Sequence, residues 1–255
     1  MATVIALFAA HMVGDFLLQP SWMVRNKHRL HVFTLHIAIT AILTVFFLGG
    51  LSTAQVWIAA STIVLSHALL DGLKTLAMLK GWLAREPRSA FIAFIADQAG
   101  HIFFIVLAAI VAPEAFASGL WTTSGMFLPG AVLSVFAIGA GAIAATRAGE
   151  FMIALFMQRF VLPSIEKKDA TADNGLVAGG AWIGLLERSL IFLLILIGQF
   201  EAIGYLLAAK SILRFQYAKD RSHSEYVIIG TLASFSWAIG LALITQTLLS
   251  RIAGN

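Results

Sequence analysis

The chain has 255 residues, of which 60% are hydrophobic and 12% charged, and it carries a formal net charge of +4. A soluble domain of this length normally has roughly twice that share of charged residues, so the composition excludes an ordinary soluble enzyme. Because the chain has no cysteine, disulfides, thiolate metal sites and cysteine nucleophiles are excluded as well. No basic tract in the sequence indicates nucleic acid as a partner.

Apolar stretches of about 20 residues, the length that crosses the hydrocarbon core of a bilayer, recur along the whole sequence. They are expected to be helical, because backbone polar groups in lipid must be satisfied within the segment, and the alternating pattern of a barrel is absent. We therefore predict an all-α, polytopic bundle of transmembrane helices. The eight predicted spans are 2–20, 30–49, 54–78, 90–112, 126–146, 179–199, 201–217 and 226–249.

A hydrophilic run at 166–177 divides the predicted bundle into a front unit of five helices, 1–165, and a back unit of three helices, 178–255. The interrupted apolar stretch 147–165 either extends the fifth helix or lies in the membrane interface. Lys and Arg are concentrated after the first, third, fifth and seventh spans, and loops rich in these residues face the cytoplasm. Both termini are therefore expected outside the cytoplasm.

Three of the predicted spans each contain one His and one Asp four residues apart. The pairs are His11 with Asp15, His67 with Asp71, and Asp97 with His101. On a helix this spacing places both side chains on one face, about one turn apart. Chance placement would give about a third of one such pair, and ionisable groups inside a bilayer are costly. The loop charges also place all six residues at one depth, toward the cytoplasmic side.

These pairs predict a metal centre. Neutral imidazole and carboxylate bind zinc, manganese or iron where no thiol is present, and we expect zinc or manganese. The six residues would hold one ion with outer carboxylates, or two ions with bridging carboxylates. Asp15, Asp71 and Lys74 are the candidate catalytic residues, and Gln19 is a candidate for binding substrate. Two alternatives stay open, namely that the pairs brace the helices or that they relay protons.

Other polar residues lie near these pairs in the sequence. His36, near the start of the second span, and Gln98, beside Asp97, extend the polar cluster. Instead of taking part in catalysis, Lys74 could extend its ammonium group to the membrane surface. A neighbouring group of basic residues is expected to form a solvated loop surface, and it consists of Lys27, His28, Arg29 and His31.

The back half of the chain also places charges inside predicted spans. Arg188, Lys210 and Arg214 are expected to bind an anionic group of the substrate, most simply phosphate, because Arg offers a forked donor and Lys a point charge. Ion pairs between helices, Glu187 with Lys210 or Glu225 with Arg214, are the structural alternative.

Three segments carry a resemblance to a known family. The opening AHMVGDFLLQPSWMVRNKH, with its His-x-x-x-Asp-Phe-x-x-Gln pattern, resembles the signature of a bacterial inner-membrane family of unknown function, and SHALLDGLK and DQAGH resemble its later motifs. The resemblance covers about the first 120 residues and implies a multi-pass protein of the bacterial inner membrane. The His/Asp helices are more loosely similar to membrane-bound metal-dependent hydrolases and to the metal sites of cation-diffusion transporters.

Three functions remain in competition. The first is a membrane-embedded, metal-dependent enzyme, a hydrolase of an anionic or phosphate-bearing lipid-like substrate at the cytoplasmic leaflet, in contact with membrane lipids. The second is a transporter for a divalent cation or a proton-coupled solute that uses the same residues. The third is a non-catalytic scaffold or receptor. The sequence leaves open whether the protein forms a homo-oligomer.

Overall fold

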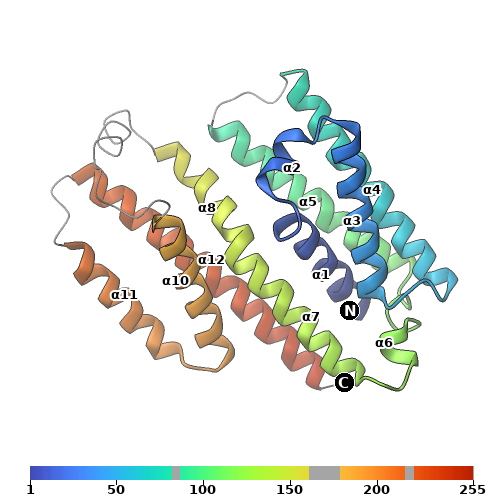
Figure 1. The fold of residues 1–255 in the computed structure, drawn as a ribbon. Helices are drawn as coiled ribbons and strands as arrows, with labels where there is room; N and C mark the ends of the chain where they lie inside the picture. Colours follow the sequence, from blue (N-terminus) through green and yellow to red (C-terminus); the bar gives the residue numbers. More distant parts are fainter. Residues whose placement is uncertain (82–86, 161–178, 216–220, 255) are drawn as a thin grey trace. The chain divides into compact units, whose positions relative to one another are not determined.

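The computed structural model describes residues 1–81, 87–160, 179–215 and 221–254, and every regular element in these ranges is helical (Figure 1). The elements are α1 (Ala2–Phe16), α2 (Ser21–Asn26), α3 (Leu30–Leu48), α4 (Ala54–Leu79), α5 (Pro87–Val111), α6 (Leu120–Thr123), α7 (Pro129–Ile143), η1 (Ala144–Ala148), α8 (Gly149–Met157), η2 (Gln158–Phe160), α10 (Gly179–Leu196), α11 (Phe200–Phe215) and α12 (Arg221–Ala253). The predicted all-α fold is confirmed.

Six helical stretches in the described ranges are long and apolar enough to cross a membrane, as expected for a multi-pass protein. They are Leu30–Leu48, Ala54–Leu79, Ser89–Val111, Pro129–Phe160, Gly179–Leu196 and Ser224–Ala253. The first and seventh predicted spans are also helical, but α1 has 15 residues and α11 has 16, fewer than the about 20 that span a bilayer. The count of eight spans is therefore approximate.

The described residues form two compact units. Residues 1–143 and 248–255 make up the N-terminal unit, and residues 144–247 make up the C-terminal unit. The apolar stretch after residue 146 continues the fifth predicted helix as far as Phe160. Of the two alternatives for this stretch, an extension of the helix or a segment in the membrane interface, the structure has the extension. The hydrophilic run at 166–177, where the sequence predicts the division into 1–165 and 178–255, lies outside the described residues.

In the N-terminal unit, α1 is the central helix. It packs against α3, α5 and α7, while α4 packs against α3 and α5. Small residues on α1 allow this close packing, since Ala6, Ala9 and Ala10 are buried and a Cβ atom on Gly14 would meet Leu43 at 3.4 Å. Because protein rather than lipid surrounds α1, this short helix can carry polar side chains.

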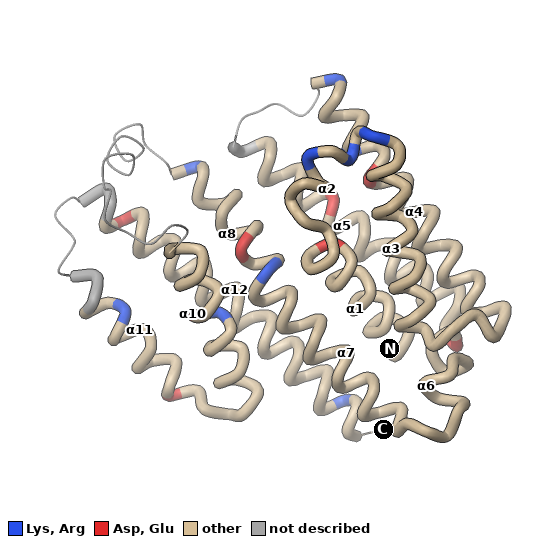
Figure 2. Tube along the Cα trace, viewed as in Figure 1, with Lys and Arg blue, Asp and Glu red and all other residues tan. Residues whose placement is uncertain are grey.

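Basic residues gather at one end of the N-terminal unit, around α2 and the adjoining end of α4 (Figure 2). Arg25 lies in the last turn of α2, and Lys27 and Lys80 follow the ends of α2 and α4. This distribution is the one that the loop charges predict for a cytoplasmic end. The orientation itself stays a prediction.

Two glycines join the end of α3 to the segment that precedes α6. Gly49 ends α3 with a φ of 84°, a left-handed conformation that suits glycine. Its carbonyl oxygen accepts a hydrogen bond of 2.8 Å from the backbone nitrogen of Leu120. A Cβ atom on Gly119 would lie only 1.9 Å from the carbonyl oxygen of Leu48, so the two backbones meet where only glycine fits.

In the C-terminal unit, a π-helical turn, η1, precedes α8. Such turns disturb the regular backbone ladder and make carbonyl oxygens available to side chains. Here the indole nitrogen of Trp237 donates to the carbonyl of Ala144 at 3.0 Å, and Nε of Arg188 donates to the carbonyl of Thr146 at 3.3 Å. Side chains from α12 and α10 thus hold this turn in place.

Candidate metal centre

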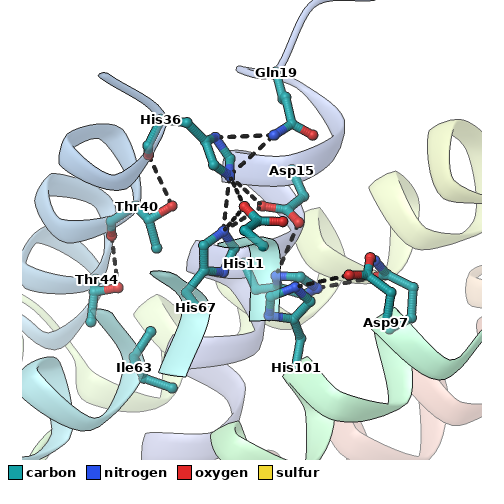
Figure 3. A network of polar contacts seen from close by, with 12 residues as sticks. His11, Asp15, Gln19, His36, Thr40, Thr44, Ile63, His67, Asp97 and His101 are labelled. Carbon is teal, nitrogen blue, oxygen red and sulfur yellow. Dashed lines mark hydrogen bonds and ion pairs between the residues drawn. The ribbon is translucent and has the colours of Figure 1, made fainter. Parts of the chain in front are cut away.

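Four imidazoles come together between α1, α3, α4 and α5 (Figure 3). His11, His36, His67 and His101 are all at most 5% exposed. The ring centroids of His67 and His101 are 4.4 Å apart, those of His11 and His101 are 4.9 Å apart, and those of His36 and His67 are 5.0 Å apart. The predicted convergence of the His/Asp helices is therefore what the fold produces, with a fourth helix, α3, added.

Each His/Asp pair lies on one helix face, but the pairs differ in closeness. Nε2 of His67 lies 3.3 Å from Oδ2 of Asp71. The nearest atoms of the His11–Asp15 and Asp97–His101 pairs are 3.8 Å apart, too far for a hydrogen bond. Among the described residues, Nδ1 of His11 and Nε2 of His101 have no hydrogen-bond partner although both are buried. Two imidazole nitrogens in the cluster are thus available to a ligand.

One compact set of donor atoms is formed by Asp15, His36 and His67. Nε2 of His36 is 2.9 Å from Nε2 of His67, and Oδ1 of Asp15 is 3.5 Å from the latter and 3.7 Å from the former. Ligand atoms around a tetrahedral zinc ion lie about 3.3–3.6 Å apart, given metal–ligand distances of about 2.0–2.2 Å. The two distances to Asp15 are close to this spacing, whereas the 2.9 Å between the two Nε2 atoms is a hydrogen-bond distance, so these imidazoles would move apart by about 0.4 Å to share a tetrahedral ion.

His36 belongs to this set, although the ligands predicted from the His/Asp spacing do not include it. No Asp lies four residues away on its own helix, where Thr40 stands instead. The available signal was a lone histidine inside an apolar span, which is costly unless it has a partner. Its side chain is fully buried, and Nε2 of Gln19 lies 3.2 Å from Nδ1 and 3.1 Å from Nε2 of the ring. Gln19, predicted to bind substrate, thus contacts His36 in the structure.

Asp71 stands beside this set and is paired with a lysine. Oδ2 of Asp71 is 3.1 Å from Nε2 of His36, and it also forms an ion pair with Nζ of Lys27. Lys27 is 9% exposed, so the prediction that it belongs to a solvated loop surface is wrong, whereas His28 and His31 are exposed as predicted. The reason is α2, which turns back after α1 and is anchored by the buried Met23, so that Lys27 at its C-cap reaches Asp71.

Asp97 has a lysine partner as well. Nζ of Lys74, a predicted catalytic residue, donates to Oδ2 of Asp97 at 2.7 Å, and Nε2 of Gln98 donates to the same oxygen at 3.2 Å. Oε1 of Gln98 is 3.2 Å from Nε2 of His11, which links this carboxylate to the imidazoles. Two of the three predicted carboxylate ligands are therefore bound to ammonium groups. Asp15 has only histidines as ion-pair partners among the described residues.

The cluster offers further groupings of ligand atoms. His11, His67 and His101 form one group, and Asp71, Asp97 and His101 form another, with the atoms of each group within 4.8 Å of one another. A cavity of about 10 Å³ lies beside the three histidines of the first group and is also lined by Thr40, Thr44 and Ser66. That volume suits one water-sized species. Since the groups share histidines, they are alternative or adjacent positions within one centre.

The basic residues predicted to bind substrate lie in the C-terminal unit. Lys210 forms an ion pair with Glu187, which is one of the structural alternatives that the sequence left open. Arg188 is 3% exposed and hydrogen bonds to Thr146 and Ser234. The backbone of Arg214 lies in α11, but its side chain is outside the described residues.

Residues 3–126 match the model of a family that is described as a protein of unknown function (DUF3307). This match includes all the residues of the metal-centre cluster and agrees with the resemblance to an uncharacterised family. Comparisons with curated proteins and with solved structures found no match.

Proposed function

We propose that the N-terminal unit is a metal-dependent hydrolase, embedded in the bacterial inner membrane, that acts on an anionic, phosphate-bearing lipid-like substrate. The observation that supports this most directly is the triangle of donor atoms from Asp15, His36 and His67, with sides of 2.9, 3.5 and 3.7 Å. Two histidines and one carboxylate are a ligand set of catalytic zinc sites, where further positions stay open to water and substrate.

Zinc or manganese is the ion that this thiol-free set of donors fits. A bound divalent ion supplies Lewis-acid chemistry, polarising the oxygen atoms of water and substrate. Asp71 is the candidate general base rather than a ligand, because its Oδ2 lies 3.1 Å and 3.3 Å from the Nε2 atoms of His36 and His67 but is paired with Lys27, whereas Asp15 pairs only with histidines among the described residues. Lys27 keeps this carboxylate oriented through their ion pair.

The charges of the centre support an anionic substrate. With neutral histidines, the three carboxylates of Asp15, Asp71 and Asp97 and the two ammonium groups of Lys27 and Lys74 leave one net negative charge. A bound divalent ion would change this to one net positive charge, which attracts an anion within a medium of low dielectric constant. The side chain of Lys74 is one-third exposed, so it is accessible to an approaching headgroup.

The test is metal content and hydrolysis measured on the same samples. Full-length protein in a neutral detergent is loaded with zinc or manganese, freed of excess ion, and assayed with a panel of phosphate-bearing and neutral lipids. His36→Ala is expected to lose both metal and hydrolysis, whereas His31→Ala, at an exposed histidine, retains both. Hydrolysis that persists after complete removal of metal, or His36→Ala with unchanged metal content, would refute the proposal.

A second function, transport of a divalent cation, is favoured by the position of the cluster along its helices. His67 and His101 lie near the middle of α4 and α5, and transport sites are found near the membrane midplane. His36, Thr40 and Thr44 follow one another on a buried face of α3, as polar groups along a pathway would. Uptake of zinc or manganese by proteoliposomes that contain the protein, but not by empty liposomes, would establish transport instead if no lipid in the panel is hydrolysed.

A further inference from the structure

The C-terminal unit contains a cavity of about 180 Å³ that the proposed metal centre does not use. Its walls come from α8, α10, α11 and α12. The charged residues that line it are Glu187, Arg188 and Lys210, and hydroxyl groups are added by Tyr226, Thr231 and Ser234. Such a combination of cationic and hydroxyl groups in an otherwise apolar bundle requires an explanation.

Arg188 is held rigidly at this cavity. Nε donates to the carbonyl of Thr146 in the π-helical turn and Nη1 donates to Oγ of Ser234, each at 3.3 Å. Two glycines make room for the side chain, because a Cβ atom on Gly184 would lie 3.0 Å from Nη1 and one on Gly149 would lie 3.2 Å from Cδ. The guanidinium is therefore oriented before any ligand arrives.

The remaining nitrogen of this guanidinium has no hydrogen-bond partner in the part of the chain that the structure describes. Nη2 is buried and makes no hydrogen bond among the described residues, and the residue as a whole is 3% exposed. A buried charged donor without an acceptor is costly, so an acceptor at this position is favoured. Water or an anionic ligand in the cavity would supply one.

The charges around the cavity favour an anion over water. Glu187 and Lys210 form an ion pair and neutralise each other, and Nζ of Lys210 also lies 5.3 Å from the ring centroid of Phe235. Nearby, Glu150 is paired with Arg147 at 2.9 Å. Among these described residues, Glu150 and Glu187 stand against Arg147, Arg188 and Lys210, which leaves one net positive charge around the cavity.

We propose that this cavity is a binding site for a phosphate group. Nη2 of Arg188 would donate to one phosphate oxygen, and Lys210 and the hydroxyl of Thr231 would be further donors. The rest of the wall includes the apolar side chains of Ile153, Ile183 and Val227, which suit the hydrocarbon part of a phospholipid better than bulk water. The site is independent of the metal centre, so it stands whether or not the N-terminal unit hydrolyses lipid.

The test uses full-length protein in a neutral, phosphate-free detergent with chelator present, so that the metal centre plays no part. Binding is followed by native mass spectrometry and by thermal unfolding. The probes are a short-chain phosphatidic acid, the matching diacylglycerol without phosphate, and inorganic phosphate. Binding of phosphatidic acid but not diacylglycerol supports the proposal. Equal binding of inorganic phosphate also supports it and identifies a free anion, rather than a lipid, as a sufficient ligand.

Arg188→Gln is expected to weaken binding of phosphatidic acid by about tenfold or more, since a hydrogen bond to a charged group is lost. The matched control, Arg251→Gln, removes an exposed guanidinium that does not line the cavity and should change the affinity less than about twofold. Because Arg188 also supports the fold, Thr231→Val provides a second variant that keeps side-chain size and should weaken binding several-fold. The proposal is overturned if diacylglycerol binds equally well, or if Arg188→Gln and Thr231→Val both bind phosphatidic acid like the unmodified protein.

Discussion

Lys27, at the end of α2, pairs with Asp71, in the second half of α4, and the two side chains are only 10% and 3% exposed. The ion pair connects the end of the short α2 to α4, one of the helices that carry the imidazoles. It also places a positive charge next to the donor atoms of His36 and His67. A lysine in a loop after the first helix has thus become part of the candidate metal centre.

The ion pair makes a prediction about stability. Lys27→Met or Asp71→Asn alone is expected to lower the free energy of unfolding by about 3–5 kcal/mol, because each leaves an uncompensated buried group. The double variant should lose clearly less than the sum of the two, as interacting residues do. Thermal unfolding of metal-free protein in detergent measures this, with Arg29→Met as an exposed control. Strictly additive effects would show that the two groups do not interact.

Asp71→Asn also separates two roles of this residue. If Asp71 is the general base, the variant keeps the bound metal within about threefold of the unmodified affinity and loses at least about a hundredfold in turnover. Metal titration and hydrolysis rates on one preparation test this. Loss of metal comparable to that of Asp15→Ala would instead make Asp71 a fourth ligand and close the site.

His101 is expected to support the ion rather than to bind it most tightly. It lies outside the triangle of Asp15, His36 and His67, and its ring centroid is 4.4 Å from that of His67. Because Nε2 of His101 is buried and has no hydrogen-bond partner among the described residues, it can add a further donor beside this set, and His101→Ala should weaken metal binding by about tenfold to a hundredfold. Equilibrium titration with zinc measures the affinity. A halved metal stoichiometry with unchanged affinity would instead indicate a second ion held by His101.

Gly119 is predicted to be intolerant of any side chain. Because its Cβ atom would lie 1.9 Å from the carbonyl oxygen of Leu48, Gly119→Ala must move backbone and should cost about 1–3 kcal/mol. Gly139, in α7, has no atom within 4 Å of the same position, and Gly139→Ala should leave stability unchanged or raise it by up to about 1 kcal/mol. Unfolding temperatures of the two variants provide the comparison. Equal effects would contradict the close approach of the two backbones.

The helical fold and the meeting of the His/Asp pairs follow from local patterns in the sequence. Apolar length predicts the helices, and a spacing of four residues puts His67 and Asp71 on one face whatever else surrounds them. The short α1 was harder to predict, because the apolar character of the residues after Phe16 suggests a longer helix, although α1 ends there.

The partners from other helices could not be predicted from spacing. His36 joins Asp15 and His67 through contacts with α1 and α4, and no pattern within α3 predicts these contacts. Likewise, Lys74 can share a helix face with Asp71, but it pairs with Asp97 of α5. Such pairings depend on how helices pack, which only the tertiary structure provides.

The enclosure of α1 has a consequence for biogenesis. This helix leaves the ribosome well before α5 and α7, two of the helices that surround it. Until they arrive, His11 and Asp15 would face lipid or the insertion machinery, an unfavourable environment for ionisable groups. A nascent chain arrested after α4 already contains Asp15, His36 and His67, but it lacks the neighbours that fix their positions. On the proposed function, we expect metal to bind only after α5 and α7 have been inserted, so that a chain arrested after α4 would be helical but free of metal.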